Sequence, residues 1–334
     1  MPIRLLAIET SCDETAAAVI EDGRLLSSSL VSQLEHSKLG GIVPELASRQ
    51  QLRAIVPVVE QALQQAGIAA GDLNGIGFTA GPGLIGSLMV GSSFAKAMAL
   101  SLNLPLIAVH HLQAHVHALF LTEPRPGFPF LCLIVSGGHT QLVVVRDYLD
   151  MEVIGETRDD AAGEAFDKTA RLLGLPYPGG PLMDQLAQSG DSEAFPFPEA
   201  SVGGYDFSFS GLKTAVRYFI EQQVRQDPQF VQNHISDVCA SVQRSIVRHL
   251  INKMEAAASD LQLSRLAIAG GVAANSLLRS ELQRIAHRHN WQCFIPPLNL
   301  CTDNAAVIAS VAYHKFLRGE LAPLSVAPDA RYRG

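Results

Sequence analysis

The sequence has few of the features that would tie a small protein together covalently or place it in a membrane. It contains five cysteines, Cys12, Cys132, Cys239, Cys293 and Cys301, an odd number without a CxxC spacing. A disulfide framework or a cysteine zinc site is therefore not expected, and a reducing compartment is the simplest environment. The first residues, MPIRLLAIETSCDET, lack the apolar stretch of a signal peptide. Because no purely apolar run approaches the roughly 20 residues that cross a bilayer, we expect a soluble, cytoplasmic protein without membrane contact.

Basic charge and aromatic side chains are also scarce. The chain has 25 Lys and Arg against 32 Asp and Glu, a net charge of −7, and 6% aromatic residues. Nucleic-acid-binding domains are usually basic, so this balance at first argues against such a partner. Hydrophobic residues make up 48% of the 334 residues, which is ample for a packed core and excludes disorder as the main state. The length suggests about two domains.

Predicted strands and helices alternate along the chain, which is typical of α/β layers. A strand–turn–strand unit is predicted over residues 4–20, and a similar unit recurs over 130–145. Two such units can face each other across a cleft and present their turns to one ligand. Further strands are predicted at 75–79, 105–109, 266–269 and 293–295. Helices are predicted at 48–67, after the turn at 81–83, near residue 111, and at 161–173, 212–224, 234–261, 276–289 and 303–317.

A histidine cluster is the first motif with chemical content. Four of the eleven histidines lie in the segment HHLQAHVHA, residues 110–118. On a helix, His111 and His115 project from one face, which suits two ligands of a divalent transition metal. The alternative is a polar face of a short helix. The HExxH glutamate of a zinc peptidase is missing, because Leu112 follows His111. Asp303 is a candidate third ligand, or else a helix N-cap.

Four glycine-rich turns form a second group, at 79–83, 136–140, 177–181 and 269–275. Glycine lets the backbone approach a ligand and exposes N–H groups to an anion, although ordinary turns use glycine as well. Two of the four follow predicted strands, and this favours a nucleotide or phosphate ligand. Neither the P-loop pattern nor the GxGxxG fingerprint is present.

Carboxylates and one unusual run complete the motifs. Asp13 and Glu14 follow the first predicted strand, whose end would point them into the cleft. The segment DDAAGEAFDK (159–168) is predicted to place four carboxylates on a helix beside Lys168, where a solvated, salt-bridged face is the simpler interpretation. The run FSFSGLKT (207–214), which leads to Lys213, has no purely amphipathic explanation.

Together these motifs resemble the TsaD family of tRNA N6-adenosine threonylcarbamoyltransferases, which is related to the KEOPS catalytic subunit. The resemblance covers the whole chain through IETSCDETAAAV, HHLQAHVHA, IVSGGHTQL, DDAAGEAFDK, YPGGP, FSFSGLKT, AGGVAANSLLR and CTDNAAVIA, in the family's order. It implies an α/β, two-lobed fold like that of actin, sugar kinases and Hsp70 (ASKHA), with duplicated ribonuclease-H-like lobes around a nucleotide cleft. We expect an N-terminal lobe of residues 1–115, onto which 304–334 packs, and a C-terminal lobe of 116–303.

The resemblance also implies an activity. The threonylcarbamoyl group of threonylcarbamoyl-AMP would pass to N6 of the adenosine at position 37 of tRNAs that read codons beginning with A. The reaction would form N6-threonylcarbamoyladenosine (t6A) and release AMP. The implied cofactor is one divalent metal ion, usually iron, with zinc and magnesium as alternatives, and ATP, ADP or AMP would fit the donor's cleft. Implied partners are tRNA, a smaller paralogous TsaB-type subunit, a TsaE-type P-loop ATPase and an upstream threonylcarbamoyl-AMP synthase.

Site residues carry over by position. The implied metal ligands are His111, His115 and Asp303, and the implied catalytic acids are Asp13 and Glu14. The implied donor-binding residues are Ile134, Val135, Ser136, Gly137, Gly138, Asp167, Gly180, Asp184 and Asn275. The histidine motif departs from the family's NHLxGH pattern, because His110 replaces the asparagine and Ala114 the glycine.

The residues leave three other functions open. A kinase or chaperone of the same fold would have the cleft, but it would leave the metal ligands unexplained. A metallopeptidase would need the missing glutamate. A non-catalytic assembly subunit is the third alternative, although family members in that role have typically lost the histidine pair.

A tRNA substrate gives the acidic net charge a different meaning, because phosphate contacts are local while net charge averages over the surface. Basic residues bunch at Arg244, Arg248 and Lys253, at Arg279, Arg284 and Arg288, and at Arg331 and Arg333. We expect weak, salt-sensitive tRNA binding by the chain alone, with partner subunits supplying part of the positive surface.

Overall fold

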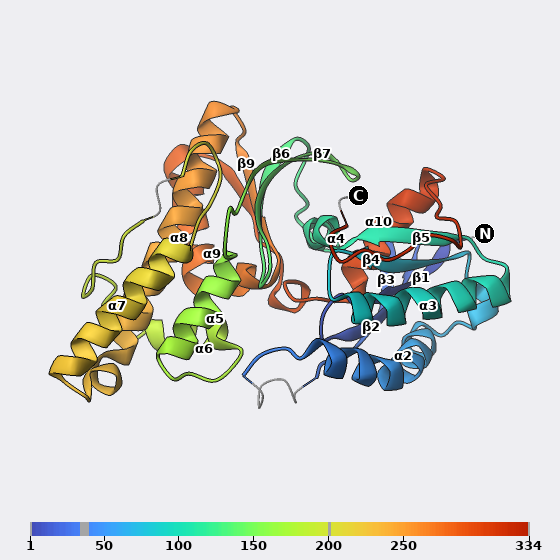
Figure 1. Cartoon of the computed structure of the whole chain (residues 1–334). Helices are drawn as coiled ribbons and strands as arrows, with labels where there is room; N and C mark the ends of the chain where they lie inside the picture. Colours follow the sequence, from blue (N-terminus) through green and yellow to red (C-terminus); the bar gives the residue numbers. More distant parts are fainter. Residues whose placement is uncertain (1, 34–39, 200–201, 333–334) are drawn as a thin grey trace. The chain divides into compact units, whose positions relative to one another are not determined.

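The computed structural model describes residues 2–33, 40–199 and 202–332. The chain forms two compact units, both drawn in Figure 1. Unit 1 comprises Met1–Arg125, Tyr148–Asp150 and Pro296–Gly334, and unit 2 comprises Pro126–Asp147 and Met151–Ile295. Residues 116–125 and 296–303 therefore lie in unit 1, whereas lobe boundaries at 115/116 and 303/304 would assign them to the other lobe. Residues 118–120 stay in unit 1 because they are buried and pack on the last helix.

Unit 1 is built on a five-stranded sheet in the order β3-β2-β1-β4-β5. Its strands are β1 (Arg4–Glu9), β2 (Thr15–Glu21), β3 (Arg24–Val31), β4 (Gly75–Gly81) and β5 (Leu106–His110). The strands β2 and β1 pair antiparallel, while β4 and β5 run parallel to β1. Helix α10 (Ala305–Leu317) covers one face, and α2 (Pro44–Ala66) and α3 (Ile85–Leu102) cover the other. Parallel strands covered on both faces are almost wholly apolar, as β1 and β4 are.

Unit 2 repeats this strand order as β8-β7-β6-β9-β10. The strands are β6 (Phe130–Val135), β7 (Thr140–Asp147), β8 (Asp150–Glu156), β9 (Arg265–Ala269) and β10 (Gln292–Phe294). The helices are α5 (Ala162–Leu172), α6 (Gly179–Ala187), α7 (Ser210–Gln226), α8 (Phe230–Asp260) and α9 (Ser276–His289). Again the second strand is antiparallel to the first, and the fourth is parallel to it. The similar segments at 4–20 and 130–145 are thus corresponding parts of two duplicated α/β units, as the sequence predicts.

Several elements differ from the sequence-based expectation. The strands β3 and β8 were not predicted, and both lie at a sheet edge with many exposed residues. Helix α6 begins inside YPGGP, where proline and glycine had indicated only a turn. The prediction that Asp159 and Asp160 lie on a helix was wrong, because α5 begins at Ala162.

Helix α3 is long and apolar enough to cross a membrane by length and composition alone, and 39% of it is buried. A single helix of this kind is weak evidence for a membrane span, because core helices of other proteins pass the same test. In unit 1, α3 packs against β4 and α2, and Val90, Ala95 and Ala99 contribute to the core.

The C-terminal tail is held to unit 1 by its backbone, although it has little apolar material. Ala322 N–H donates to the Leu106 carbonyl at 2.7 Å, and Asp329 N–H donates to the Ala80 carbonyl at 2.9 Å. Gly81 adopts φ +145°, and a Cβ there would lie 2.0 Å from the Asp329 carbonyl oxygen. Only glycine lets the tail approach the end of β4 this closely.

Candidate functional site

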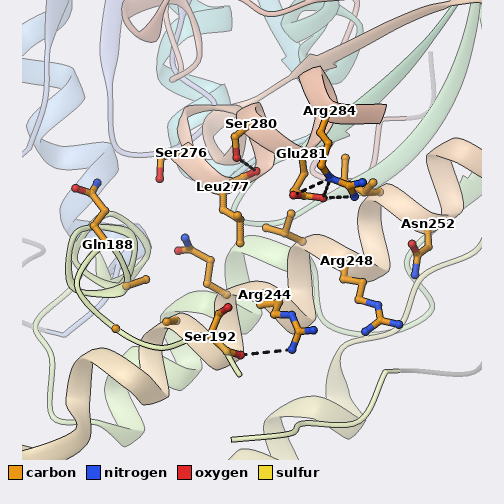
Figure 2. A pocket seen from close by; sticks show the side chains of 16 residues that line it. Gln188, Ser192, Arg244, Arg248, Asn252, Ser276, Leu277, Ser280, Glu281 and Arg284 are labelled. Carbon is orange, nitrogen blue, oxygen red and sulfur yellow. Dashed lines mark hydrogen bonds and ion pairs between the residues drawn. The ribbon is translucent and has the colours of Figure 1, made fainter. Parts of the chain in front are cut away.

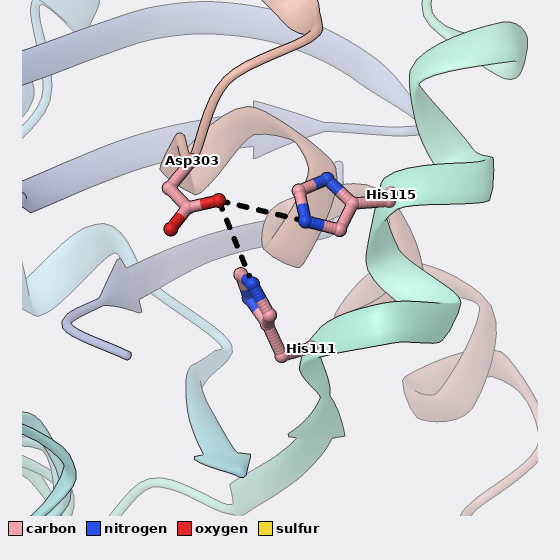
Figure 3. Close-up of side chains that lie close together, drawn as sticks. All are labelled: His111, His115 and Asp303. Atoms are coloured by element: carbon pink, nitrogen blue, oxygen red, sulfur yellow. Dashed lines mark ion pairs between the residues drawn. The ribbon is translucent and has the colours of Figure 1, made fainter. Parts of the chain in front are cut away.

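Two histidines and one aspartate meet in unit 1. Helix α4 (His111–His117) follows β5 directly and places His111 and His115 one turn apart on the same face. Asp303 lies in the turn before α10. Figure 3 shows the three side chains converging: Asp303 Oδ1 lies 3.5 Å from Nε2 of each histidine. One ligand atom from each residue lies within 4.8 Å of the others, close enough to share one metal ion.

Neighbouring residues cap the helices that carry these groups. Asn304 caps α10, because its side chain accepts the Val307 N–H at 3.2 Å. Nδ1 of His110 accepts the N–H groups of Leu112 and Gln113 at 3.2 and 3.4 Å, which caps α4. Asp303 is therefore not the N-cap of α10, and the histidine at position 110 has a structural task separate from His111 and His115.

Glu9 supports the metal-binding group from behind. It ends β1 with 1% exposure, and its Oε2 lies 3.1 Å from His111 Nδ1 and 2.7 Å from the Thr79 hydroxyl that donates to it. Its Oε1 accepts the Ser11 N–H at 2.5 Å. A carboxylate on Nδ1 keeps the proton there and leaves Nε2 free to bind a metal. Sequence reasoning missed Glu9, although a carboxylate that ends an otherwise apolar strand is a visible signal.

Negative charge is crowded around this site. Burial alone would lower the pKa of His111, but Glu9 and Asp303 raise it to about 9. Burial raises the pKa of Asp303 to about 6. The charges of Glu9 and Asp13 raise this pKa as well, whereas His111 lowers it. Burial and the charges of Asp303 and Asp13 raise the pKa of Glu14 to about 9. A divalent cation would relieve this repulsion.

The donor set itself fits a metal ion. Two imidazole nitrogens and one carboxylate oxygen suit divalent transition metals and leave coordination positions open. Burial, followed by the charges of Asp303 and Asp13, raises the pKa of the nearby Cys12 thiol.

The predicted catalytic acids lie in the turn between β1 and β2. Gln51 holds this turn from α2, because its side-chain amide donates to the carbonyl oxygens of Cys12 and Glu14 at 2.9 and 3.0 Å. Beyond the effect of burial, the charge of Asp13 raises the pKa of both Asp303 and Glu14, and the charge of Asp303 raises the pKa of Glu14, so both acids belong to the surroundings of the candidate metal site.

In unit 2, the predicted donor-binding residues gather where β6 ends. Ile134 and Val135 are buried in β6, and Ser136, Gly137 and Gly138 form the turn that follows. Gly163 at the start of α5 donates its N–H to the Ser136 carbonyl at 3.3 Å. The space around Gly137 and Gly138 is open, so their backbone can be approached by a ligand.

Helix α6 carries the next two predicted residues. Asp167 on α5 accepts the N–H groups of Gly179 and Gly180 at 2.9 and 3.2 Å, which fixes the start of α6. Asp184 accepts from the Ser276 hydroxyl at 2.7 Å and from the Asn275 amide at 3.3 Å. The structure therefore links Asp167 to Gly180, and Asp184 to Asn275.

Gln243 joins the same network and was not predicted. Its amide donates to Asp184 at 3.0 Å, and its carbonyl oxygen accepts from Asn275 at 3.1 Å. Gln243 and Ser276 also line a cavity of about 740 Å³ that borders α8 and α9 (Figure 2). The cavity was not visible in the sequence, because its walls come from segments far apart in the chain.

Comparison with known proteins identifies one family over most of the chain. The profile of a family described as tRNA N6-adenosine threonylcarbamoyltransferase matches residues 24–310. The protein of that name from Cytophaga hutchinsonii is 53% identical over 333 residues, covering 100% of this chain and 97% of the relative. The one from Christiangramia forsetii is 52% identical, covering 99% and 98%.

Solved structures of low identity share the fold. Full-length HypF in its phosphate- and nucleotide-bound form has a TM-score of 0.63 at 13% identity, covering 95% of this chain and 47% of that one. Component A of (R)-2-hydroxyglutaryl-CoA dehydratase from Acidaminococcus fermentans has a TM-score of 0.54 at 15% identity, covering 94% and 98%. The fold is the duplicated α/β fold of the actin, sugar kinase and Hsp70 class. The chain belongs to the TsaD family of tRNA N6-adenosine threonylcarbamoyltransferases.

Proposed function

We propose that this chain transfers the threonylcarbamoyl group from threonylcarbamoyl-AMP to N6 of adenosine 37 in tRNAs that read codons beginning with A, with release of AMP. The observation that carries the proposal is the group His111, His115 and Asp303, held by Glu9 in a chain related to these transferases over its full length. A kinase or chaperone of this fold would have no use for that group.

The chemistry needs little from the protein besides position and charge. The donor is a mixed anhydride, and its carbamoyl carbon is already activated because AMP is a good leaving group. The attacking N6 amine is a weak nucleophile. Orientation and stabilisation of developing negative charge are therefore the main tasks. A divalent ion, iron by family resemblance, would act as a Lewis acid when held by His111, His115 and Asp303.

The chain's own residues divide the remaining work. Glu9 keeps His111 in the tautomer that binds metal. The open backbone of Gly137 and Gly138 offers N–H groups to the donor's phosphate.

Glu14 orients the attacking amine or accepts its proton. Burial and the charges of Asp303 and Asp13 raise the pKa of this carboxyl to about 9, and a cation held nearby would lower the pKa again so that the ionised carboxylate can serve as a base. A Glu14→Ala enzyme that keeps the full transfer rate with donor bound would refute this role.

Metal content tests the ligand assignment. Elemental analysis should find metal lost in His111→Ala, His115→Ala and Asp303→Ala. It should find metal retained in His110→Ala, which removes the cap of α4, worth about 1 kcal/mol of stability, and the ring contact with Tyr332. Retention of a full metal complement by any of the first three would contradict the assignment.

The activity itself is tested in cells and in vitro. Mass spectrometry of tRNA nucleosides should show loss of t6A when the protein is depleted. Purified protein should transfer the group from threonylcarbamoyl-AMP, whereas phosphotransfer from ATP or peptide cleavage with metal bound would favour the kinase or peptidase alternative. ATP, ADP and AMP should compete with the donor for the site in unit 2.

The proposal includes the protein's setting. We expect a TsaB-type paralogous subunit and a TsaE-type ATPase as partners in the cytoplasm, with threonylcarbamoyl-AMP synthase supplying the donor. Reconstitution tests this: turnover should rise when the partner subunits are added to the chain. Full activity of the chain alone would show that the partners are dispensable.

A further inference from the structure

The FSFSGLKT segment is fixed rigidly within unit 2. Phe207 and Phe209 are buried and pack edge-on against His249, with ring centroids at 5.8 and 5.4 Å. Asp159 accepts the N–H groups of Phe209 and Ser210 at 2.7 and 3.3 Å, at the start of α7. These contacts determine where α7 begins and therefore where its fourth residue, Lys213, lies.

Lys213 forms a long ion pair with Asp160 and no side-chain hydrogen bond to the described residues. Its Nζ lies 3.6 Å from Asp160 Oδ2, outside hydrogen-bond distance. Lys168 Nζ lies 2.8 Å from the other oxygen of Asp160 and 2.7 Å from Glu164 Oε1, so it is shared between two carboxylates. A cation near a helix N-terminus also opposes the helix dipole. Helix stability does not account for Lys213, and its ammonium has three N–H donors that can reach an anion without giving up a hydrogen bond to the described residues.

The loop that carries Asp160 also holds the glycine turn after β6. Two residues beyond Asp160, Ala162 N–H donates to the Thr140 hydroxyl at 2.9 Å. Gly163 packs so closely that a Cβ there would lie 2.5 Å from the Ser136 carbonyl oxygen. Residues 159–163 therefore connect Lys213 to the turn at 136–140 through direct contacts.

We propose that Lys213 binds an oxyanion group of the acyl donor. The proposal rests on the proposed function, which brings an anionic nucleotide to the turn at 136–140. That donor carries two oxyanions, the adenylate phosphate and the carboxylate of its threonine moiety, and an ammonium serves either. Asp160 acts as a positioning residue that keeps Lys213 on this side of α7.

The test compares Lys213→Gln with Arg217→Gln and Lys213→Arg. Arg217 lies one turn further along α7, pairs with Glu221 at 3.7 Å and covers the Tyr218 ring, so its loss removes the same charge from the same helix. Calorimetry with AMP and with adenosine measures binding with and without the phosphate. Steady-state transfer with threonylcarbamoyl-AMP separates KM from kcat, and thermal unfolding checks that each variant folds.

Two results would support the proposal. If Lys213 holds the phosphate, Lys213→Gln weakens AMP about tenfold or more and leaves adenosine unchanged. If it holds the carboxylate, AMP binding is unchanged and KM for the donor rises by a similar factor. In either case Lys213→Arg restores most of the loss, and Arg217→Gln behaves as the parent chain.

Other results would overturn it. Equal behaviour of Lys213→Gln and Arg217→Gln in both assays excludes an anion contact, as does an equal loss of AMP and adenosine binding. If the parent chain transfers nothing even with its partner subunits added, but Lys213→Gln still loses AMP selectively, the proposed function fails while the anion contact stands.

Discussion

At the scale of single residues, Glu9 decides whether the metal ligands are usable. His111 and His115 supply nitrogen donors, but His111 must be neutral with its proton on Nδ1 to bind a metal through Nε2. Glu9 lies 3.1 Å from Nδ1 and is itself held by Thr79 and the Ser11 backbone. The carboxylate therefore fixes both the tautomer and the ring orientation.

Replacing Glu9 with Gln should lower metal affinity about 10- to 100-fold, because an amide holds the Nδ1 proton more weakly than a carboxylate. Titration of the metal-free protein with Fe²⁺ or Zn²⁺ measures this. Glu21→Gln is the matched control, since Glu21 pairs with Arg4 at 2.6 Å in the same sheet and touches no ligand. Equal affinity in the two variants would show that Glu9 does not support His111.

The sequence predicted the histidine pair but not its support, for a physical reason. His111 and His115 are four residues apart, and helix periodicity alone puts them on one face. Glu9 meets Thr79 and His111 across 70 and 102 residues, a contact that no local pattern encodes. The sequence left two roles possible for Asp303, metal ligand or helix N-cap. The structure shows that Asn304 is the N-cap of α10.

At the scale of elements, the glycines at and near the turn after β6 have two different roles, one in packing and one in ligand binding. A Cβ on Gly163 would lie 2.5 Å from the Ser136 carbonyl oxygen and 2.8 Å from Gly137 Cα, whereas a Cβ on Gly138 meets open space. One glycine is needed for packing, and the other leaves room for a ligand.

Gly163→Ala should therefore destabilise the fold by about 1–3 kcal/mol through overpacking. Gly138→Ala should keep its stability and lose affinity for AMP, because its methyl group fills the space the phosphate would take. Chemical denaturation and calorimetry measure the two effects separately. Unchanged AMP binding in Gly138→Ala would remove the turn from the nucleotide site.

Helix α4 is anchored by His117, which is fully buried. The Tyr148 carbonyl can only accept, so Nε2 donates to it at 2.8 Å, and Nδ1 accepts from the Ser310 hydroxyl at 2.9 Å. Burial lowers the pKa of His117 from 6.5 to about 3. The hydrogen bond to the Tyr148 carbonyl opposes this shift, and the charge of His314 adds to it. The imidazole thus remains neutral in the folded chain.

A depressed pKa makes stability depend on pH in one direction. The contribution of His117 is complete above pH 6.5, its unfolded value, and is lost as pH falls toward about 3. His117→Asn should be less stable than the parent chain at pH 7.5, and the gap should narrow on acidification by a few kcal/mol, to order of magnitude. Urea unfolding between these pH values checks this, with exposed His287→Asn as control. A gap that stays constant with pH would show that His117 does not titrate.

The elements themselves were largely readable from sequence. Each unit's first two strands showed as an apolar run, a small-residue turn and a second apolar run, and the repeat pointed to duplication. The edge strands β3 and β8 were missed because their exposed residues give no apolar pattern. Helix α6 was missed because its stability comes from Asp167 on α5, which satisfies the N–H groups of two glycines.

At the scale of the whole molecule, most of the bunched basic residues on α8 and α9 are already paired within the chain. Arg244, Arg248, Arg284 and Arg288 each pair with a glutamate, at 2.6, 2.7, 2.5 and 2.5 Å. Lys253 donates to the carbonyl oxygens of Val202 and Gly204. Arg333 lies outside the described residues. These cations of α8 and α9 are therefore already partnered within the chain.

tRNA binding should accordingly be weak for this chain alone. Affinity for a phosphate backbone comes from cations that release counterions, and cations already paired with carboxylates release few. Binding measured by filter retention across a salt series should weaken further as salt rises. Adding the proposed partner subunits should tighten it and steepen the dependence of log K on log salt, because we expect them to supply unpaired positive charge. Tight, salt-insensitive binding by the isolated chain would mean that base stacking or shape, and not phosphate contacts, holds the tRNA.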